Sequence, residues 1–483
     1  MVNIIVEVVK YTLIILFAIY TYKCFSVFRQ SDYIRQLAVL KTQTGLTFAI
    51  HFTAFLALYL TMDQPMRVLI FYAAQVVLLV LTISLYTTLY PKSSRLVLNN
   101  MCMLLVIGFI MLTRLNIDKA IKQFLIVAVS IVISFFVPVM IRKMKFLRNL
   151  TWFYAVVGIA ALLAVLALAT VTGGAKLSFT IGSFSVQPSE FVKILFVFFV
   201  AASYKSATDF KHVCITSLVA AIHVLILVAS TDLGAAVILF TVYLVMLYAA
   251  TRQPLYLGAG VLLGCGAGVL AYKLFKHVRI RVMVWKDPFA NWNYGYQVGQ
   301  ALFAIGTGGW FGMGLMQGMP TKIPVVENDF IYAAIAEELG SIFAILLILV
   351  CVSCYVMFLN IAMRIRDQFY KLVALGLGTC YIFQVFLNIG GVTKFIPLTG
   401  VTLPWISYGG SSILSAAIMF AIIQGLYILR EDEDEELERR KALEEYRRRR
   451  QERSFRGTRG ASKRKIQEDE RALDEKRRSG RYR

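Results

Sequence analysis

The chain has 483 residues, of which 58% are hydrophobic and only 16% charged, and its formal net charge at pH 7 is +22. This composition excludes an ordinary soluble protein, because such a protein would expose large apolar patches to water. The positive charge does not indicate nucleic-acid binding, because much of it lies in short loops between apolar segments, as expected of cytoplasmic loops in a membrane protein.

Thirteen apolar segments approach the length that crosses roughly 30 Å of hydrocarbon as a helix. A transmembrane β-barrel is excluded, because these segments do not alternate between polar and apolar residues. The sequence therefore predicts an all-α polytopic membrane protein with spans at about 4–22, 47–62, 68–90, 98–113, 121–141, 151–171, 188–204, 212–230, 233–250, 255–275, 330–362, 369–392 and 409–430.

An odd number of spans places the two termini on opposite sides of the membrane. Basic loops at 23–46, 142–150 and 363–368 predict that the N-terminus lies outside and the C-terminal tail lies in the cytoplasm. The segments expected on the outer face are 172–187, the turn at Thr231-Asp232, 276–329 and 393–408. The charged tail 431–483 is expected to be partly disordered and to contact anionic membrane lipids.

Carboxylates gather in the polar, glycine-rich stretch from Trp285 to Gly340. Asp329 directly precedes a predicted helix, so it is either a helix N-cap or a general base at the water-facing mouth of the bundle. Glu337 and Glu338 lie about two turns further along, and we expect one of them to face the bundle interior and pair with a cation.

Several cations accompany these acids. Glu190 and Lys193 are three residues apart at the start of a span, which predicts either a buried ion pair or a counter-charge for an anionic substrate. Arg279, Arg281 and Lys394 are placed on the outer face, against the usual charge bias, where a diphosphate ligand or anionic lipid heads would explain them. The cysteines are expected to be buried small hydrophobes, and no metal-ligand cluster is predicted.

Several short sequence tracts, taken together and in their order along the chain, resemble the sequences of the SEDS family (shape, elongation, division, sporulation). This family includes FtsW, RodA and SpoVE. The resemblance covers about 100–430. The tracts are Gly182 through Glu190 with Lys193, Thr231 through Ala236, Trp285 through Pro288, Gly295 through Gln297, Gly308 through Gly314, Asn328 through Tyr332, Glu337 through Gly340, Asn388 through Gly390, and Pro404 through Ser412.

The resemblance implies a ten-helix core at 98–430, preceded by about three extra transmembrane helices in 1–97 and followed by the tail 431–483. It implies a bacterial peptidoglycan glycosyltransferase that polymerises lipid II on the outer face of the cytoplasmic membrane, for division, elongation or sporulation. A class B penicillin-binding protein would be its crosslinking partner. A lipid II flippase and a non-catalytic scaffold for such a partner remain as alternatives.

The resemblance also implies roles for particular residues. Asp329 matches the essential aspartate of the family, which fits a base that takes the proton of an attacking sugar hydroxyl. Arg281 is the expected diphosphate contact, supported by the Lys193–Glu190 pair, and a divalent cation (Mg²⁺ or Mn²⁺) could share the leaving-group role. Further candidate substrate contacts are Arg279, Lys394, Gln297, Glu337, Glu338 and Ser411.

Overall fold

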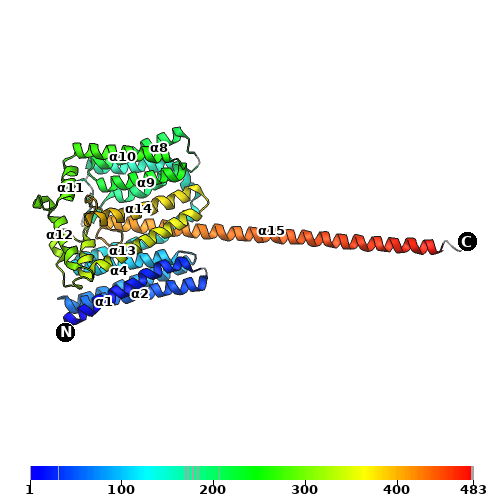
Figure 1. Cartoon of the computed structure of the whole chain (residues 1–483), viewed down its shortest axis with the longest axis horizontal. Coiled ribbons are helices and arrows are strands. Elements are labelled where there is room, and N and C mark those ends of the chain that lie inside the picture. Colours follow the sequence, from blue (N-terminus) through cyan, green and yellow to red (C-terminus); the bar gives the residue numbers. More distant parts are fainter. Residues whose placement is uncertain are drawn as a thin grey trace. The chain divides into compact units, whose positions relative to one another are not determined.

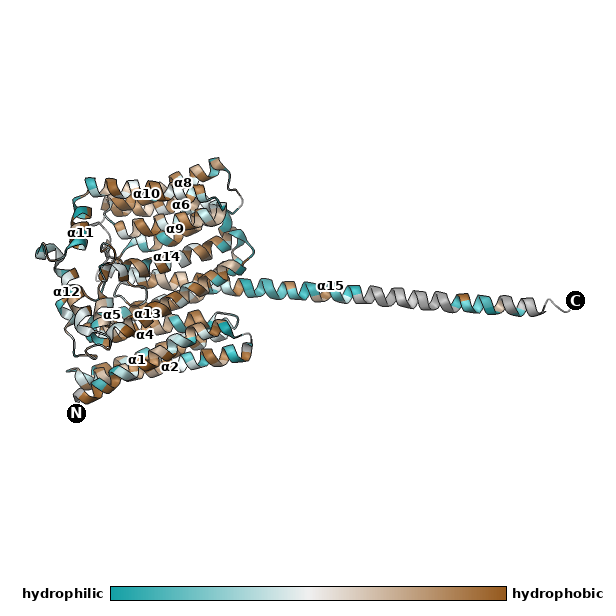
Figure 2. Ribbon diagram, in the orientation of Figure 1, coloured by the Kyte–Doolittle hydropathy of each residue, from teal (hydrophilic) through white to brown (hydrophobic). Residues whose placement is uncertain are grey.

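In the computed structural model, the chain forms a bundle of long helices followed by a charged helical extension (Figure 1). The structure describes residues 2–30, 32–168, 171–172, 175–176, 179–181, 184–205 and 207–479. Two compact units result, 1–428 and 429–483. In Figure 2, hydrophobic residues run along the helices of the first unit, whereas hydrophilic residues colour many helix ends and connections.

The secondary structure is almost entirely helical. The helices are α1 (Val2–Ser26), η1 (Val27–Arg29), α2 (Tyr33–Thr61), α3 (Pro65–Leu89), α4 (Arg95–Leu115), α5 (Ile117–Lys143), η2 (Lys145–Asn149), α6 (Thr151–Leu168), α7 (Pro188–Ser203), α8 (Phe210–Ala229), α9 (Leu233–Thr251), α10 (Pro254–Leu274), α11 (Lys276–Lys286), α12 (Trp292–Gly308), η3 (Pro320–Lys322), α13 (Ile331–Arg364), α14 (Gln368–Val392) and α15 (Gly410–Ser479). Between α6 and α7 in the chain, β1 (Val171–Thr172) pairs antiparallel with β2 (Ala175–Lys176), and β3 (Phe179–Ile181) pairs antiparallel with β4 (Phe184–Val186).

The predicted spans correspond to helices of the structure. Among the described residues, twelve helices are long and apolar enough to cross a membrane, and the remaining predicted span is α7, which has 16 residues. The prediction of a polytopic helical membrane protein is thereby confirmed. The core of the bundle is α4, whose residues 96–113 are all buried.

Two predicted loops contain helices. The segment 23–46 was predicted as a loop, but α2 already begins at Tyr33, because the Asp32 side chain caps it by accepting a hydrogen bond from the backbone N–H of Ile34 (3.1 Å). The segment 276–329 contains α11 and α12, which lie at one end of the bundle, the end that also holds the N-terminus (Figure 1).

The three N-terminal helices pack against the rest of the bundle, and residues 1–428 form one compact unit. A buried polar network supports this contact: the Tyr20 hydroxyl donates to Asn100 Oδ1 (2.9 Å), and Asn100 Nδ2 donates to Ser353 Oγ (3.3 Å). The network joins α1, α4 and α13. The division of the chain into 1–97, 98–430 and 431–483 remains a prediction.

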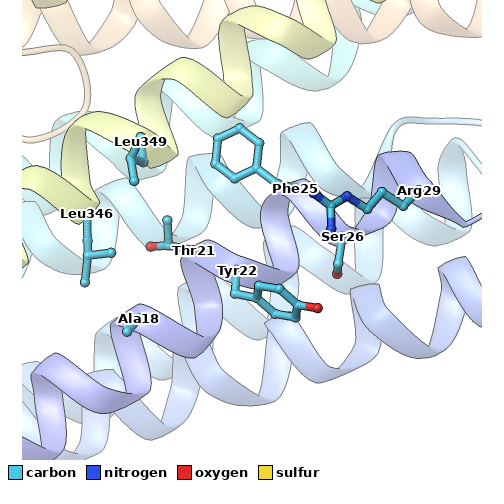
Figure 3. A pocket seen from close by; sticks show the side chains of 8 residues that line it. All are labelled: Ala18, Thr21, Tyr22, Phe25, Ser26, Arg29, Leu346 and Leu349. Carbon is cyan, nitrogen blue, oxygen red and sulfur yellow. The ribbon is translucent and has the colours of Figure 1, made fainter.

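A mostly apolar groove of about 280 Å³ lies between α1 and α13 (Figure 3). Its wall consists of α1 and η1 side chains from Ala18 to Arg29 together with Leu346 and Leu349 of α13. Among the described residues, no acidic side chain lines this groove.

Candidate active site

Asp329 lies immediately before α13, but it does not cap this helix. The N-cap position is Phe330, whose side chain makes no capping hydrogen bond. The backbone of Asp329 is held in place by Asn388 of α14, whose Nδ2 donates to the Asp329 carbonyl (2.9 Å) and to the Val401 carbonyl (2.7 Å). Gly400 adjoins the carboxylate, because a Cβ at this glycine would lie 3.7 Å from Asp329 Oδ2. The carboxylate is therefore positioned by the fold and remains available for chemistry.

The surroundings of Asp329 suit a base. Burial raises the pKa of the Asp329 carboxyl to about 6, neighbouring Glu327 also raises it, and Arg281 opposes this shift. A general base works best when its pKa lies near the pH at which it operates. Glu327 is itself paired with Lys119 of α5, and its carbonyl accepts a hydrogen bond from the backbone N–H of Tyr408 (2.7 Å).

Arg281 of α11 is a cation that acts electrostatically on Asp329. Its Nη1 donates to the Thr399 carbonyl (3.1 Å), next to Gly400. Burial lowers the pKa of Arg281, whereas the negative charges of Asp232 and Asp329 raise it. The guanidinium therefore lies within electrostatic reach of two carboxylates, where it can also meet an anionic group of a ligand.

Asp232 is a site residue that was not among the sequence candidates. It caps α9 by accepting from the Ala235 N–H (3.1 Å), and its other oxygen accepts from Ser189 Oγ (2.9 Å) and Gln187 Nε2 (3.3 Å). The signal for it was the Thr231-Asp232 turn before an apolar helix, which was placed on the outer face and in a matching tract without Asp232 being named as a site residue. Asp232 connects the start of α9 to the start of α7.

The predicted pair at the start of α7 is formed and buried. Lys193 Nζ lies 2.8 Å from Glu190 Oε2 and donates to Gln384 Oε1 (2.8 Å), while the Lys193 side chain is only 2% exposed. Gln384 of α14 in turn donates to the Thr402 carbonyl (3.0 Å). Hydrogen bonds through Gln384 thus link Lys193 to the irregular segment that contains Thr402 and precedes α15. The Lys193 ammonium does not face open solvent.

Ser411, near the start of α15, contacts β4 and the residue that precedes α7. Its Oγ accepts from the Gln187 N–H (2.8 Å) and donates to the Ser185 carbonyl (3.3 Å). In the matching tract that contains Gln187, Gly182 and Ser183 lie outside the described residues. Ser411 therefore has a positioning contact, and its role in substrate binding stays a prediction.

Glu337 and Glu338 form a second centre, because α13 breaks at Gly340, where φ is +89° and ψ is 162°. The break frees the carbonyls of Glu337 and Glu338, which accept from the backbone N–H groups of Met313 (2.8 Å) and Gly314 (2.9 Å). The buried Glu338 carboxylate pairs with Arg114 of α4 (2.7 Å). The expectation that one of the two acids pairs with a cation is thus met by Glu338.

Three further candidates lie near this end of the bundle without a hydrogen bond or ion pair to Asp329 in the described part of the chain. Arg279 is exposed on α11, and Gln297 is half-buried on α12. Lys394 follows α14 with φ +60°, and its carbonyl accepts from Trp285 Nε1 (3.2 Å). Their proposed substrate contacts remain predictions.

The described residues contain no group of three or more His, Cys, Asp or Glu side chains that could hold a metal ion. The side chains present therefore do not form a protein cage for Mg²⁺ or Mn²⁺. A divalent cation here would depend largely on oxygens of a bound diphosphate, as is common for Mg²⁺.

Comparison with known proteins agrees with this geometry. The family described as "FTSW_RODA_SPOVE: Cell cycle protein" matches residues 94–431. The chain is 40% identical over 267 residues to peptidoglycan glycosyltransferase RodA of Mycobacterium tuberculosis, covering 52% of this chain and 57% of that protein. It is 33% identical to stage V sporulation protein E of Bacillus subtilis, covering 60% of this chain and 82% of that protein. The matched region thus spans little more than half of the mycobacterial relative.

Solved structures show the same fold. One, from work titled "Structural coordination of polymerization and crosslinking by a peptidoglycan synthase complex", has a TM-score of 0.60 at 19% identity and covers 70% of this chain and 98% of its own. The rod shape determining protein RodA of Thermus thermophilus has a TM-score of 0.51 at 18% identity, covering 69% of this chain and 96% of its own. The bundle, the polar centre and the match over 94–431 lead to one conclusion: this multi-pass membrane protein belongs to the FtsW/RodA/SpoVE family.

Proposed function

We propose that the protein is a peptidoglycan glycosyltransferase that polymerises lipid II. The observation that carries the proposal is a single polar centre in which Asp329, a partly buried carboxyl whose pKa is raised to about 6, lies within electrostatic reach of Arg281. Relatives that carry the name peptidoglycan glycosyltransferase support it. Glycosyl transfer needs both a base for the attacking hydroxyl and a cation for the departing diphosphate.

In the proposed mechanism, the hydroxyl of the acceptor sugar attacks the anomeric carbon of the donor. Asp329 takes the hydroxyl proton as the new glycosidic bond forms, and the bond from the anomeric carbon to the diphosphate oxygen breaks. The electron pair of that bond leaves on the diphosphate, whose charge Arg281 stabilises. Glu190 and Lys193 fix the position of α7 relative to the segment around Thr402, and so act as positioning residues.

The proposal includes the orientation and the partners of the protein. The basic loops support an outer location for Asp329 and a cytoplasmic location for the tail. A class B penicillin-binding protein is the proposed crosslinking partner, supported by the solved synthase complex of similar fold. The proposal also includes a divalent cation held mainly by the substrate diphosphate, which would help Arg281 to neutralise the charge of the leaving group.

The test is to reconstitute the purified protein in liposomes with labelled lipid II and to measure glycan strands. We expect strands from the wild type and a loss of about 10²-fold to 10⁴-fold in rate for Asp329→Asn, because asparagine keeps the shape but cannot accept the proton. Asp63→Asn, which changes an exposed carboxylate in the turn between α2 and α3, is the matched control. Movement of lipid II across the bilayer without strand synthesis would instead identify a flippase. A protein that neither moves lipid II nor synthesises strands would be identified as a scaffold.

A further inference from the structure

The groove between α1 and α13 is apolar along most of its length and carries a cation at one end (Figure 3). Most of its wall consists of carbon-rich side chains, those of Ala18, Tyr22, Phe25, Leu346 and Leu349. Among the described residues, Arg29 of η1 is the only charged residue that lines it. In Figure 3 the Arg29 side chain extends back from η1 toward Phe25 and Ser26. The groove therefore offers an apolar track that ends at a guanidinium.

Arg29 has no counter-charge of its own. It is exposed, and in the described part of the chain it makes no ion pair and no side-chain hydrogen bond. The surrounding segment 23–46 contains a single acid, Asp32, whose carboxylate lies 3.8 Å from Arg35. All other charged residues of this segment are basic. The charged end of the groove thus favours an anion, and a planar guanidinium matches the oxygens of a phosphate.

The groove lies far from the proposed active site. The first half of α1 contacts the chain that follows α12, because the rings of Tyr11 and Phe311 are 5.8 Å apart. The helices α11 and α12 lie at the end of the bundle that holds the N-terminus (Figure 1). Arg29 comes eighteen residues after Tyr11 along α1 and η1, which corresponds to about 27 Å. A substrate diphosphate beside Arg281 of α11 is therefore not the anion that Arg29 would meet.

The length of the groove fits one leaflet of a bilayer. From Ala18 to Arg29 the chain advances by eleven residues, or about 16 Å along a helix. This length is roughly half of the ~30 Å hydrocarbon core of a membrane. The basic segment 23–46 is among those that the positive-inside bias assigns to the cytoplasm, and the cytoplasmic leaflet carries anionic lipids. Basic pockets between transmembrane helices on that side are typical sites for phospholipid head groups.

We propose that this groove binds one anionic phospholipid of the cytoplasmic leaflet, with its phosphate on the Arg29 guanidinium and one acyl chain along α1 and α13. The bound lipid connects α1, which precedes the family match over 94–431, to α13 of the matched region. The inference is independent of the proposed glycosyltransferase function.

The test is photolabelling of the full-length protein in phosphatidylcholine nanodiscs. The probe is a phosphatidylglycerol whose acyl chain carries a diazirine, and a phosphatidylcholine with the same acyl chain is the head-group control. Labelled peptides are identified by mass spectrometry. In the wild type we expect the segments 17–29 and 343–350 to be labelled about fivefold more by the phosphatidylglycerol probe, as one arginine near an anionic head group predicts.

Two pairs of variants test the two parts of the site. Arg29→Gln should lower phosphatidylglycerol labelling of the groove about fivefold, whereas Arg29→Lys should keep most of it. Arg364→Gln removes an exposed cation in the last turn of α13, outside the groove wall, and should leave the labelling unchanged. Ala18→Phe fills the apolar track and should lower labelling by both probes, whereas Ile19→Phe, at an exposed neighbour outside the wall, should not.

Equal labelling of the groove by the two probes in the wild type would overturn the proposal. Unchanged phosphatidylglycerol labelling in Arg29→Gln, or unchanged labelling in Ala18→Phe, would overturn it as well. If Arg29→Gln does not fold, as judged by gel filtration, the two probes on the wild type and on Ala18→Phe decide the question. Strand synthesis takes no part in this test, so failure of the proposed function remains a separate result.

Discussion

Removing one member of the buried Glu190–Lys193 pair should destabilise the protein strongly. Lys193 is 2% exposed, and its ammonium contacts Glu190 Oε2 and Gln384 Oε1, each at 2.8 Å. Glu190→Leu leaves the buried Lys193 ammonium without its counter-charge. Lys193→Met leaves the buried Glu190 carboxylate without its counter-charge. Each change is expected to lower the free energy of unfolding by about 3–5 kcal/mol. The double variant carries no buried charge, so it should lie within about 1 kcal/mol of the wild type.

The assay is a double-mutant cycle on the free energy of unfolding, measured by denaturant titration in detergent micelles. The exposed pair formed by Arg67 and Asp118 is the control, and Asp118→Ala should cost only about 0–1 kcal/mol. A cost below about 1 kcal/mol for Lys193→Met, or a double variant whose cost equals the sum of both single changes, would refute the reasoning. It would then follow that the pair does not fix α7 against α14.

Five further predictions concern other features of the protein. The rate of strand synthesis should fall as the pH drops through about 6, because only the ionised Asp329 accepts a proton; a rate unchanged down to pH 5 would remove it as the base. Because the raised pKa makes ionisation of Asp329 unfavourable to folding, Asp329→Asn should gain melting temperature over the wild type as the pH rises from 4 to 7, and a constant difference would contradict this. Gly340→Ala should abolish the folded fraction in gel filtration, because its Cβ would lie 2.5 Å from the Gly312 backbone nitrogen, whereas Gly306→Ala in open space on α12 should fold normally. Asn100→Ala should lower stability by about 1–3 kcal/mol in thermal unfolding, because it leaves Tyr20 and Ser353 without their partner, and a change below 0.5 kcal/mol would argue that the network is not structural. EDTA should slow strand synthesis reversibly, with Mg²⁺ or Mn²⁺ restoring the rate; an unchanged rate would exclude the proposed cation.

The membrane helices could be predicted from the sequence, because each long apolar run must satisfy its backbone internally once it is in lipid. The helices α11 and α12 were not predicted, because neither has the length and apolar composition of a span. The first part of α2 was read as a loop because it carries Arg35, Lys41 and several other polar residues, although Asp32 is a good N-cap. In the prediction, the low average hydrophobicity of the first part of α2 was thus given more weight than the N-cap signal of Asp32.

The candidate site was predicted only in part. Asp329, Arg281 and the Glu190–Lys193 pair were identified from their positions near span ends and in the matching tracts. Asp232 and Gln384 were missed, because their roles depend on contacts with residues 43–191 positions away. Spacing along the chain cannot reveal such contacts, which arise only when α7, α9 and α14 pack together.

The rate of glycan-strand formation from labelled lipid II, compared between the wild type and Asp329→Asn at pH 7.5, tests the central claim most directly. We predict abundant strands from the wild type and a rate at least about 100-fold lower from the variant, with both proteins equally well folded. Equal rates would contradict the assignment of Asp329 as the base of this reaction.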